Sequence, residues 1–408
     1  MEETRWTSVL TDGPGETVRS IVARVMNAIA ITPYAQLDSL ALLHQVLLFT
    51  YAAREHLSFS ANVDVNSRLS LALEAVSADL PLFLHGGLVE VAWIVEHLDR
   101  MSRDGISGLA EEANYLAAID ELIFAELDKD VWQGHYDLIS GLVGIGVYLL
   151  ERLPRPSARR YLERVIYHLD RSATATEDEI RVWRTSPAHM SSSERMLCPV
   201  GGYNLGVAHG IPGVIRFLSE CVANSIRPTK SRALLDEAVK WVLMQVDPFD
   251  GSNFPCWITP GRVIKRTRLG WCYGDLGTAA SLFQTAEIIG NSPLKMSMLD
   301  VLRRCAERVP QRTTNVGICH GCLGVAHVFN RIYHSCGEVV FRTRAIEYYL
   351  HGASAFMSFG SADHKWGFLE GNCGSVLALL AGISSIEPAW DRSLLLSDNV
   401  SFAIGLSH

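Results

Sequence analysis

The sequence lacks any uninterrupted apolar stretch of the roughly 20 residues that cross a bilayer. The longest candidates, Leu40–Ala53 and Val376–Ile383, are interrupted or too short. The chain opens with MEETRWTSVL, which has neither the basic segment nor the apolar segment of a secretion signal. We therefore expect no transmembrane helix and a cytoplasmic protein.

An excess of basic residues is also missing. Thirty-six Lys and Arg stand against 44 Asp and Glu, for a net charge of −8, whereas a protein that binds nucleic acid without sequence preference gathers positive charge. We expect no nucleic-acid partner. The nine cysteines are an odd number in a chain of 408 residues without a secretion signal, which favours reduced thiols over a disulfide framework.

Alternating, strand-like patterns are few, and apolar residues recur instead at helical spacing. The stretches with this spacing are Ser39–Ala53, Leu88–Leu98, Glu112–Leu127, Gly141–Leu153, Ala158–Leu169, Val214–Ala223, Ala233–Val246, Ala279–Ile289, Met296–Val309, Gly324–Ile332 and Arg342–Phe356. The chain is predicted to be all-α, with helices that follow one another roughly in pairs.

Glycine is present at an average level, 32 of 408 residues, but its positions repeat. Two glycines three residues apart precede an apolar helix five times, at Gly141 and Gly144, Gly210 and Gly213, Gly274 and Gly277, Gly321 and Gly324, and Gly371 and Gly374, with a degenerate copy at 85–90. Glycine inside a helix costs about 1 kcal/mol relative to alanine. The repetition therefore indicates close approach of backbones where these helices begin.

Glycine-marked helices whose first turns converge on one rim, each paired with an outer helix, predict an α/α toroid. The stretch Ser39–Ala53 would be an additional inner helix without the glycine marker. The alternative is an open solenoid of the HEAT type, but such solenoids usually have shorter repeats without paired glycines. We favour the closed ring.

If the marked ends converge, the residues just before the glycines face a common cavity. These residues are Asp137 with Ser140, His209, Trp271 to Tyr273, Cys319 with His320, and Glu370. Cys272 and Cys319 each lie two positions before a repeat glycine, and His320 follows Cys319. Two thiolates and one imidazole are typical of a catalytic zinc site, which leaves its fourth position open. We predict that Cys272, Cys319 and His320 bind one Zn²⁺.

The remaining cysteines have a simpler explanation, because a buried free cysteine behaves as a small apolar residue. We assign Cys198, Cys221, Cys256, Cys305, Cys336 and Cys373 to packing. Cys322 stays ambiguous: its spacing from Cys319 is that of a CxxC half-site, yet a helix that had begun by residue 322 would turn this thiol into helix packing.

The phased glycines, together with the WCYG, CHG and AHG blocks, resemble the lanthionine synthetase C family, the cyclases of class I lantibiotic biosynthesis. The resemblance extends from about His85 to Gly374. It implies a toroid of seven inner and seven outer helices, with zinc held by Cys272, Cys319 and His320 and with water or a substrate thiol as the fourth ligand.

The resemblance also implies catalytic residues. The family's histidine in the AHG block matches His209, and its aspartate four residues before a repeat glycine matches Asp137. Its arginine four residues before the first zinc cysteine matches Arg268, and its tyrosine after that cysteine matches Tyr273. Their alternatives are a helix-capping carboxylate for Asp137, a solvated basic run over 265–268, and simple packing for Tyr273. Asp275 and Cys322 depart from the family pattern and could alter the pocket wall.

The implied reaction is an intramolecular Michael addition, in which a cysteine thiol of a precursor peptide attacks dehydroalanine or dehydrobutyrine to form a lanthionine or methyllanthionine ring. The implied partners are the dehydrated precursor, with its leader and core, and a dehydratase and an ABC transporter in a biosynthetic complex that is peripherally associated with the membrane. A zinc-dependent α/α-barrel prenyltransferase and a non-catalytic peptide-binding scaffold of the same fold are the alternatives.

The whole chain, 1–408, is expected to be one toroid domain. Residues 171–203 break the helical pattern with clusters of Ser, Thr and Pro, and loops longer than about 15 residues are usually functional or disordered. Because a small SH2-like extension occurs on the toroid in this family, this stretch is expected to supply a comparable extension or a flap over the cavity.

Overall fold

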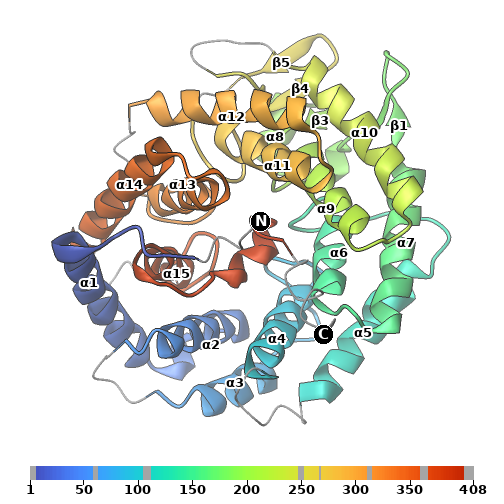
Figure 1. The fold of residues 1–408 in the computed structure, drawn as a ribbon. Helices are drawn as coiled ribbons and strands as arrows, with labels where there is room; N and C mark the ends of the chain where they lie inside the picture. The colour runs from blue at the N-terminus through green and yellow to red at the C-terminus, as the bar shows by residue number, and fades with distance from the viewer. Residues whose placement is uncertain are drawn as a thin grey trace, which may run out of the picture. The chain divides into compact units, whose positions relative to one another are not determined.

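The computed structural model describes residues 6–57, 63–103, 112–246, 252–265, 268–309, 315–358 and 366–398. Within these ranges the chain is almost entirely helical (Figure 1). Every predicted helical stretch coincides with an α-helix whose ends differ from the prediction by a few residues. No helix among the described residues has the length and apolar character that a membrane span requires.

The chain forms two compact units, Met1–Leu80 with Ala306–Ala389 and Pro81–Cys305 with Trp390–His408, called the first and second unit below. The first unit holds α1 (Asp12–Ala30), α2 (Ser39–Arg54), α3 (Val65–Glu74), α13 (Cys322–Cys336), α14 (Val339–Ser358) and α15 (Asn372–Ile383). The second unit holds α4 (Leu88–Arg103), α5 (Glu112–Leu127), α6 (Leu142–Glu151), α7 (Pro156–Ser172), α8 (Ser192–Leu197), α9 (Ile211–Ala223), α10 (Pro228–Met244), α11 (Asp275–Ile288) and most of α12 (Ser292–Glu307).

Buried and amphipathic helices alternate along the second unit. All residues of α6 are buried, and α9 and α11 are buried over most of their length, whereas α7 buries one face only. In Figure 1, α4, α6, α9 and α11 follow one another on the inner side of this unit, and α5, α7, α10 and α12 lie outside them. The pairing of an inner with an outer helix, inferred from the repeat, is therefore present.

In the first unit the beginning of the chain packs against its last α-helix. The amides of Val9 and Leu10 both donate to the carbonyl oxygen of Gly382, at 3.1 and 2.9 Å, and Figure 1 shows α2 and α15 as neighbours. The beginning of the chain and its last α-helix are thus in direct contact within this unit.

The repeat glycines stand where inner helices begin, as predicted. The helices that follow Gly141, Gly210, Gly274, Gly321 and Gly371 are α6, α9, α11, α13 and α15. The close approach is to the chain's own preceding loop, since a Cβ on the second glycine would collide with the carbonyl oxygen six residues earlier. These pairs are Gly144 with Leu138, Gly213 with Val207, Gly277 with Trp271, Gly324 with Ile318 and Gly374 with Phe368, and the degenerate copy adds Gly87 with Pro81.

The same loops satisfy the first amides of the helices, which have no partner inside the helix. The amide of Gly144 donates to the carbonyl of Asp137, that of Gly277 to Gly270, and that of Cys322 to Asn315, each seven residues back. Each loop therefore arches over its helix N-terminus, and the residues at the top of the arch include the predicted site residues. We call these loops the arches.

Outside the stretch 171–203, two helices, α1 and α3, were not predicted. The first begins with Asp12 to Pro14, residues typical of a turn, although Val18, Ile21, Val22 and Val25 lie buried on one face. The second is short and is capped by the side chain of Asp64, which accepts from the amides of Asn66 and Ser67. Apolar periodicity does not predict α1 because turn-forming residues begin it, and it does not predict α3 because that helix is short.

In the stretch 171–203, the α-helical residues are the last two of α7 and the short helix α8. Strands β1 (Thr174–Ala175) and β2 (Arg181–Val182) pair with each other. Strand β3 (Tyr203–Asn204) pairs with β4 (Trp257–Thr259), which pairs with β5 (Arg262–Ile264). A small apolar cluster of Met190, Cys198, Cys256, Trp257 and Ile264 joins the stretch 171–203 to the hairpin of β4 and β5. The stretch therefore packs on the segment that precedes α11.

Candidate active site

In the second unit, the arch before α6 contacts the arch before α9 through two predicted catalytic residues. The Nδ1 atom of His209 lies 2.8 Å from Oδ2 of Asp137, although the residues are far apart in the sequence. The Asp137 side chain is 6% exposed, and that of His209 is 39% exposed. A buried carboxylate therefore holds an imidazole that remains accessible.

The charge of Asp137 favours the protonated form of His209. Partial burial disfavours the imidazolium, but the hydrogen bond to Asp137 and the charge of that carboxylate outweigh it, with a further contribution from Glu194. Together they raise the pKa of His209. The histidine is therefore set to act as a proton donor near neutral pH.

Asp137 is not the capping residue of α6, whose N-cap is Gly141, but it does hold the loop before that helix. Its Oδ1 atom accepts from the amide of Ser140 at 2.7 Å, inside the arch before α6. One carboxylate oxygen thus stabilises the arch while the other holds His209.

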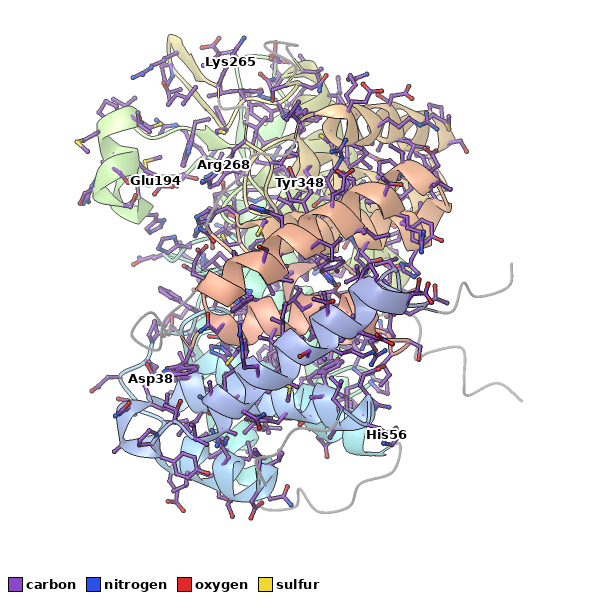
Figure 2. All side chains as sticks on the ribbon, turned by 90° about the vertical axis from the view of Figure 1, so that its left-hand side faces the viewer. Asp38, His56, Glu194, Lys265, Arg268 and Tyr348 are labelled. Carbon is purple, nitrogen blue, oxygen red and sulfur yellow. The ribbon has the colours of Figure 1, made fainter. Side chains whose placement is uncertain are left out.

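A cavity of about 330 Å³ opens beside this pair within the second unit. Its wall is lined by His135, Asp137, Thr185, Ala188, His189, Met190, Ser191, Glu194, Asn204, His209 and Trp257. Six of these residues come from the stretch 171–203. Figure 2 shows α8, which carries Glu194, standing out from the helices of its unit.

Two further histidines in this cavity were not predicted. The rings of His135 and His189 stack with centroids 4.4 Å apart, and Nδ1 of His135 lies 3.8 Å from Oδ2 of Asp137. Burial lowers the pKa of His135, despite the nearby charge of Asp137. His189 lies in the insertion, outside the glycine repeat. His135 lies two residues before Asp137, where the repeat signal was available.

Cys272 lies in the arch before α11, next to the arch of His209. Its carbonyl oxygen accepts from the amide of Val207 at 2.9 Å. The Nη2 atom of Arg268 lies 3.7 Å from the Sγ atom of Cys272, so the predicted arginine contacts the predicted ligand. The guanidinium favours the thiolate form, which is the form that binds metals. Residues 266 and 267 of the basic run lie outside the described residues.

Tyr273 points into the insertion region. Its hydroxyl accepts from Nδ2 of Asn204 at 2.6 Å and lies 3.5 Å from Oε1 of Glu194, while its ring packs on the small apolar cluster. Burial raises the pKa of Tyr273 well above its ordinary range, so the phenol stays neutral. Its contacts are those of a residue that links α8 and β3 to the arch of Cys272.

Cys319 and His320 lie in the first unit, in the arch before α13. The Nδ1 atom of His320 is 3.0 Å from Oε1 of Glu370, which belongs to the arch before α15. Burial alone would raise the pKa of Glu370, but its hydrogen bond and charge interaction with His320 hold that pKa below its usual range. An ionised carboxylate only accepts, so Nδ1 of His320 donates the proton in this contact.

The structure accounts for two residues whose roles were open. Helix α13 begins at Cys322, whose thiol is buried against α14 beside Gly352, and burial raises the pKa of Cys322 to about 11. Asp275 is fully buried and accepts from the amides of Asn253 and Phe254 at 2.9 to 3.0 Å. It anchors the segment before β4 and does not line the cavity.

A match to a known family identifies the class of this protein. The description "Lanthionine synthetase C-like protein" matches residues 81–395, and the chain therefore belongs to the lanthionine synthetase C-like family, as predicted from its motifs. Among its relatives is the nisin biosynthesis protein NisC of Lactococcus lactis subsp. lactis, which is 24% identical over 336 residues, 78% of each chain.

The solved structure of a nisin cyclase matches 95% of this chain and 98% of its own, with a TM-score of 0.75 and 19% sequence identity. The match confirms the predicted fold class, an α/α toroid.

Proposed function

We propose that the protein is a zinc-dependent lanthipeptide cyclase, which forms lanthionine and methyllanthionine rings by intramolecular Michael addition. One observation carries this proposal. In the second unit, a thiol of the type that binds zinc, Cys272, and an imidazole held by a carboxylate, His209, lie on arches joined by the hydrogen bond from Val207 to Cys272. Family membership and the relation to the nisin protein give the same direction.

The proposed zinc ligands are the residues that the family motifs imply, Cys272, Cys319 and His320. Their chemistry fits zinc: two thiols are soft donors, Arg268 favours the thiolate of Cys272, and Glu370 orients the imidazole of His320 through Nδ1. Three protein ligands leave one position open for a substrate.

The reaction adds a thiol across a carbon–carbon double bond. The sulfur bonds to the β-carbon of the dehydro residue, the double bond is lost, and one proton must reach the α-carbon, so no oxidant or reductant is consumed. A bound zinc ion supplies the acidity that keeps a substrate thiol deprotonated near neutral pH.

His209 supplies the proton transfer in this proposal. Protonated at its exposed edge and held at Nδ1 by Asp137, it donates from Nε2 to the α-carbon. A neutral His209 could instead accept the proton of an incoming thiol, and the same contact with Asp137 stabilises the imidazolium that results. Asp137 acts through His209 in both directions.

We propose different roles for Arg268 and Tyr273. The Arg268 guanidinium, one contact from Cys272, is placed to favour negative charge on sulfur or on the developing enolate oxygen. The hydroxyl of Tyr273 is already engaged by Asn204. We therefore propose that Tyr273 positions the arch of Cys272 and does not transfer a proton.

The proposed substrate is a dehydrated lanthipeptide precursor with its leader and core. We further propose a cytoplasmic protein, in one toroid domain over 1–408, that works beside a dehydratase and an ABC transporter in a complex at the membrane. The stretch 171–203 is proposed as a flap, because its residues form much of the cavity wall beside His209.

Two alternatives make different demands. A prenyltransferase of the α/α-barrel type would process an isoprenoid diphosphate, and the family assignment does not favour it. A peptide-binding scaffold would keep the metal ligands but would tolerate replacement of His209.

The test begins with metal content. The purified chain should bind about one zinc, and Cys272→Ala or Cys319→Ala should abolish binding. The matched control is Cys305→Ala, another cysteine, which is buried inside α12. The protein is then incubated with a dehydrated precursor, and free thiols are alkylated. Ring closure protects the thiols, so full alkylation in the presence of bound zinc would contradict the cyclase proposal.

The scaffold alternative is separated by His209→Asn. This variant should retain zinc and lose or misdirect ring closure. An unchanged rate with an unchanged ring pattern would remove His209 from the mechanism.

A further inference from the structure

The described C-terminal residues 390–398, which we call the strap, pass along the helices of the second unit. Three successive contacts use their main-chain carbonyl oxygens. Ser393 accepts from Nε2 of His85 at 3.2 Å, Leu394 from Nε1 of Trp271 at 3.0 Å, and Leu396 from Nε2 of Gln284 at 2.6 Å. The strap is therefore held by α11 and by the arches before α4 and α11.

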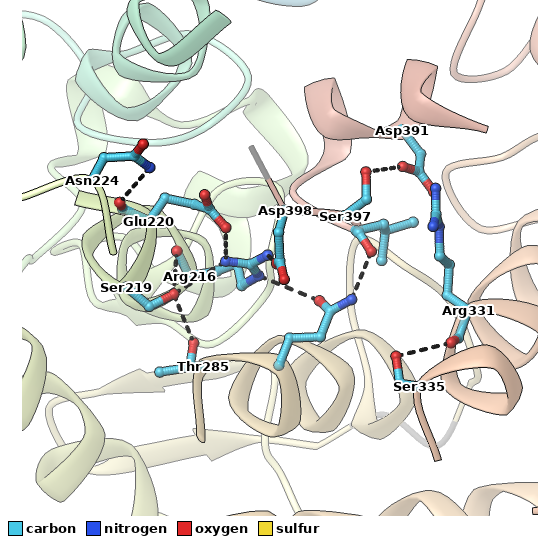
Figure 3. Close-up of polar contacts among 12 residues, drawn as sticks. Arg216, Ser219, Glu220, Asn224, Thr285, Arg331, Ser335, Asp391, Ser397 and Asp398 are labelled. Carbon is cyan, nitrogen blue, oxygen red and sulfur yellow. Dashed lines mark hydrogen bonds and ion pairs between the residues drawn. The ribbon is translucent and has the colours of Figure 1, made fainter. Parts of the chain in front are cut away.

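Ion pairs fix both ends of the strap. The guanidinium of Arg216, fully buried in α9, binds Asp398 and also Glu220, whose Oε1 lies 2.6 Å away (Figure 3). Near the other end, Arg392 lies 3.8 Å from Glu151 of α6. A clip from Ser397 to Asp391, 2.6 Å long, joins the two ends.

The backbone of the strap is unusual between two of these contacts. Leu395 has φ of 57°, in the left-handed region that residues with a side chain rarely adopt. Such a conformation persists where the surroundings determine it. Here it turns the chain so that Leu394 and Leu396 accept from different donors, Trp271 and Gln284.

Trp271 directly precedes Cys272, and its side chain is completely buried. The backbone of Cys272 is held by the amide of Val207, and its sulfur lies beside Arg268. The remaining side of this arch is fixed by the indole of Trp271 on the carbonyl of Leu394. The strap thus contacts the residue next to the proposed zinc ligand.

We propose that the strap sets the position of Cys272 for zinc through the hydrogen bond from Trp271 to Leu394, which makes Trp271 a positioning residue. This inference rests on the proposed function, because it takes Cys272 as a ligand. Residues that orient a metal ligand usually contribute about 10- to 100-fold to metal affinity.

The test compares two Trp→Phe substitutions of equal volume. Trp271→Phe removes the indole donor. Trp93→Phe is the matched control in α4, because Trp93 is also buried but its Nε1 has no hydrogen-bond partner among the residues that the structure describes. Zinc affinity is measured by chelator competition, and the absorption of the cobalt-substituted chain reports the thiolate geometry.

We expect Trp271→Phe to bind zinc about tenfold or more weakly and to change the cobalt spectrum, while Trp93→Phe leaves both unchanged. A second variant, Asp398→Asn, acts at the far end of the strap, where the carboxylate is half exposed. It should also weaken zinc binding, to a smaller extent than Trp271→Phe. If Trp271→Phe does not fold, the zinc affinity of Asp398→Asn decides whether the strap positions Cys272.

Wild-type zinc affinity and cobalt spectra in both strap variants would overturn the inference while the proposed function stands. Failure of the wild-type chain to bind zinc, or zinc binding that survives Cys272→Ala, would instead overturn the proposed function.

Discussion

The carboxylate of Asp137 binds His209 with one oxygen and the amide of Ser140 with the other, at 2.8 and 2.7 Å. The orientation of the histidine is therefore coupled to the conformation of the arch before α6. Movement of this arch would carry the carboxylate away from the imidazole, so the acid–base pair depends on a helix N-terminus.

The first prediction concerns the titration of His209. Its pKa is raised in the folded protein, so the stabilisation from the Asp137 contact is fully present below the unfolded pKa and is lost as pH rises through the folded pKa. Asp137→Asn should lower the pKa of His209 while its amide oxygen still caps Ser140. NMR titration of the ring measures this change, and an unmoved pKa would contradict it.

The second prediction concerns the activity of the same variant. If protonated His209 is required, cyclisation should decline as pH rises through its pKa, and Asp137→Asn should move that decline to lower pH. Loss of general acid catalysis costs about 10²- to 10⁴-fold in rate, which sets the scale for His209→Asn. A pH–rate profile that is the same in the wild type and Asp137→Asn would count against the pair.

The third prediction concerns Glu370 and zinc. Glu370→Gln weakens the acceptor that holds Nδ1 of His320, so zinc affinity should fall by about 10- to 100-fold. Glu347→Gln is the control, because Glu347 in the same unit pairs with Arg344 on the surface. Equal zinc affinity in the two variants would show that Glu370 does not support the ligand.

The fourth prediction concerns the repeat glycines. Gly324→Ala places a Cβ against the carbonyl oxygen of Ile318, and overpacking of this kind typically costs about 1–3 kcal/mol. Gly13→Ala, in the first turn of α1 with no atom near the added Cβ, should be neutral or slightly stabilising. Denaturant unfolding of both variants tests the contrast, which requires a lower midpoint for Gly324→Ala alone.

The fifth prediction separates positioning from proton transfer at Tyr273. Tyr273→Phe keeps the ring on the apolar cluster but leaves Nδ2 of Asn204 without its acceptor, which costs about 1–3 kcal/mol of stability. The rate of ring closure should fall by less than the roughly 10²-fold expected for loss of an acid–base group. A larger fall at saturating substrate would make Tyr273 catalytic.

Much of the helical framework could be predicted because the glycines mark local geometry. Gly144 and Gly374 occur where a loop six residues back crosses the first turn, a constraint that leaves a signal at fixed spacing. Helix α1 lacked that signal and began with turn residues. Strands of two or three residues, such as β1 and β3, are too short to show alternation.

The residues of the candidate site could likewise be predicted where they lie in the glycine repeat and could not be predicted outside it. His209 and Asp137 could be predicted from the repeat phase and the family motifs, and the structure brings them into contact. Glu194 and His189 lie in the stretch 171–203, outside the glycine repeat, so no repeat position marks them in the sequence. The structure places both in the cavity wall. Glu370 stood at a repeat position, but its pairing with His320 required coordinates.

The arches divide the sequence into two kinds of position. The glycines and the main-chain carbonyls six and seven residues before them determine whether the helix can start. These groups do not depend on the side chain at the top of the arch, except at Asp137, which also accepts from Ser140. A thiol or an imidazole at another arch could therefore be exchanged without rebuilding the helix start. For protein engineers, each of the six glycine-marked arches is a loop in which a new functional side chain could be introduced separately.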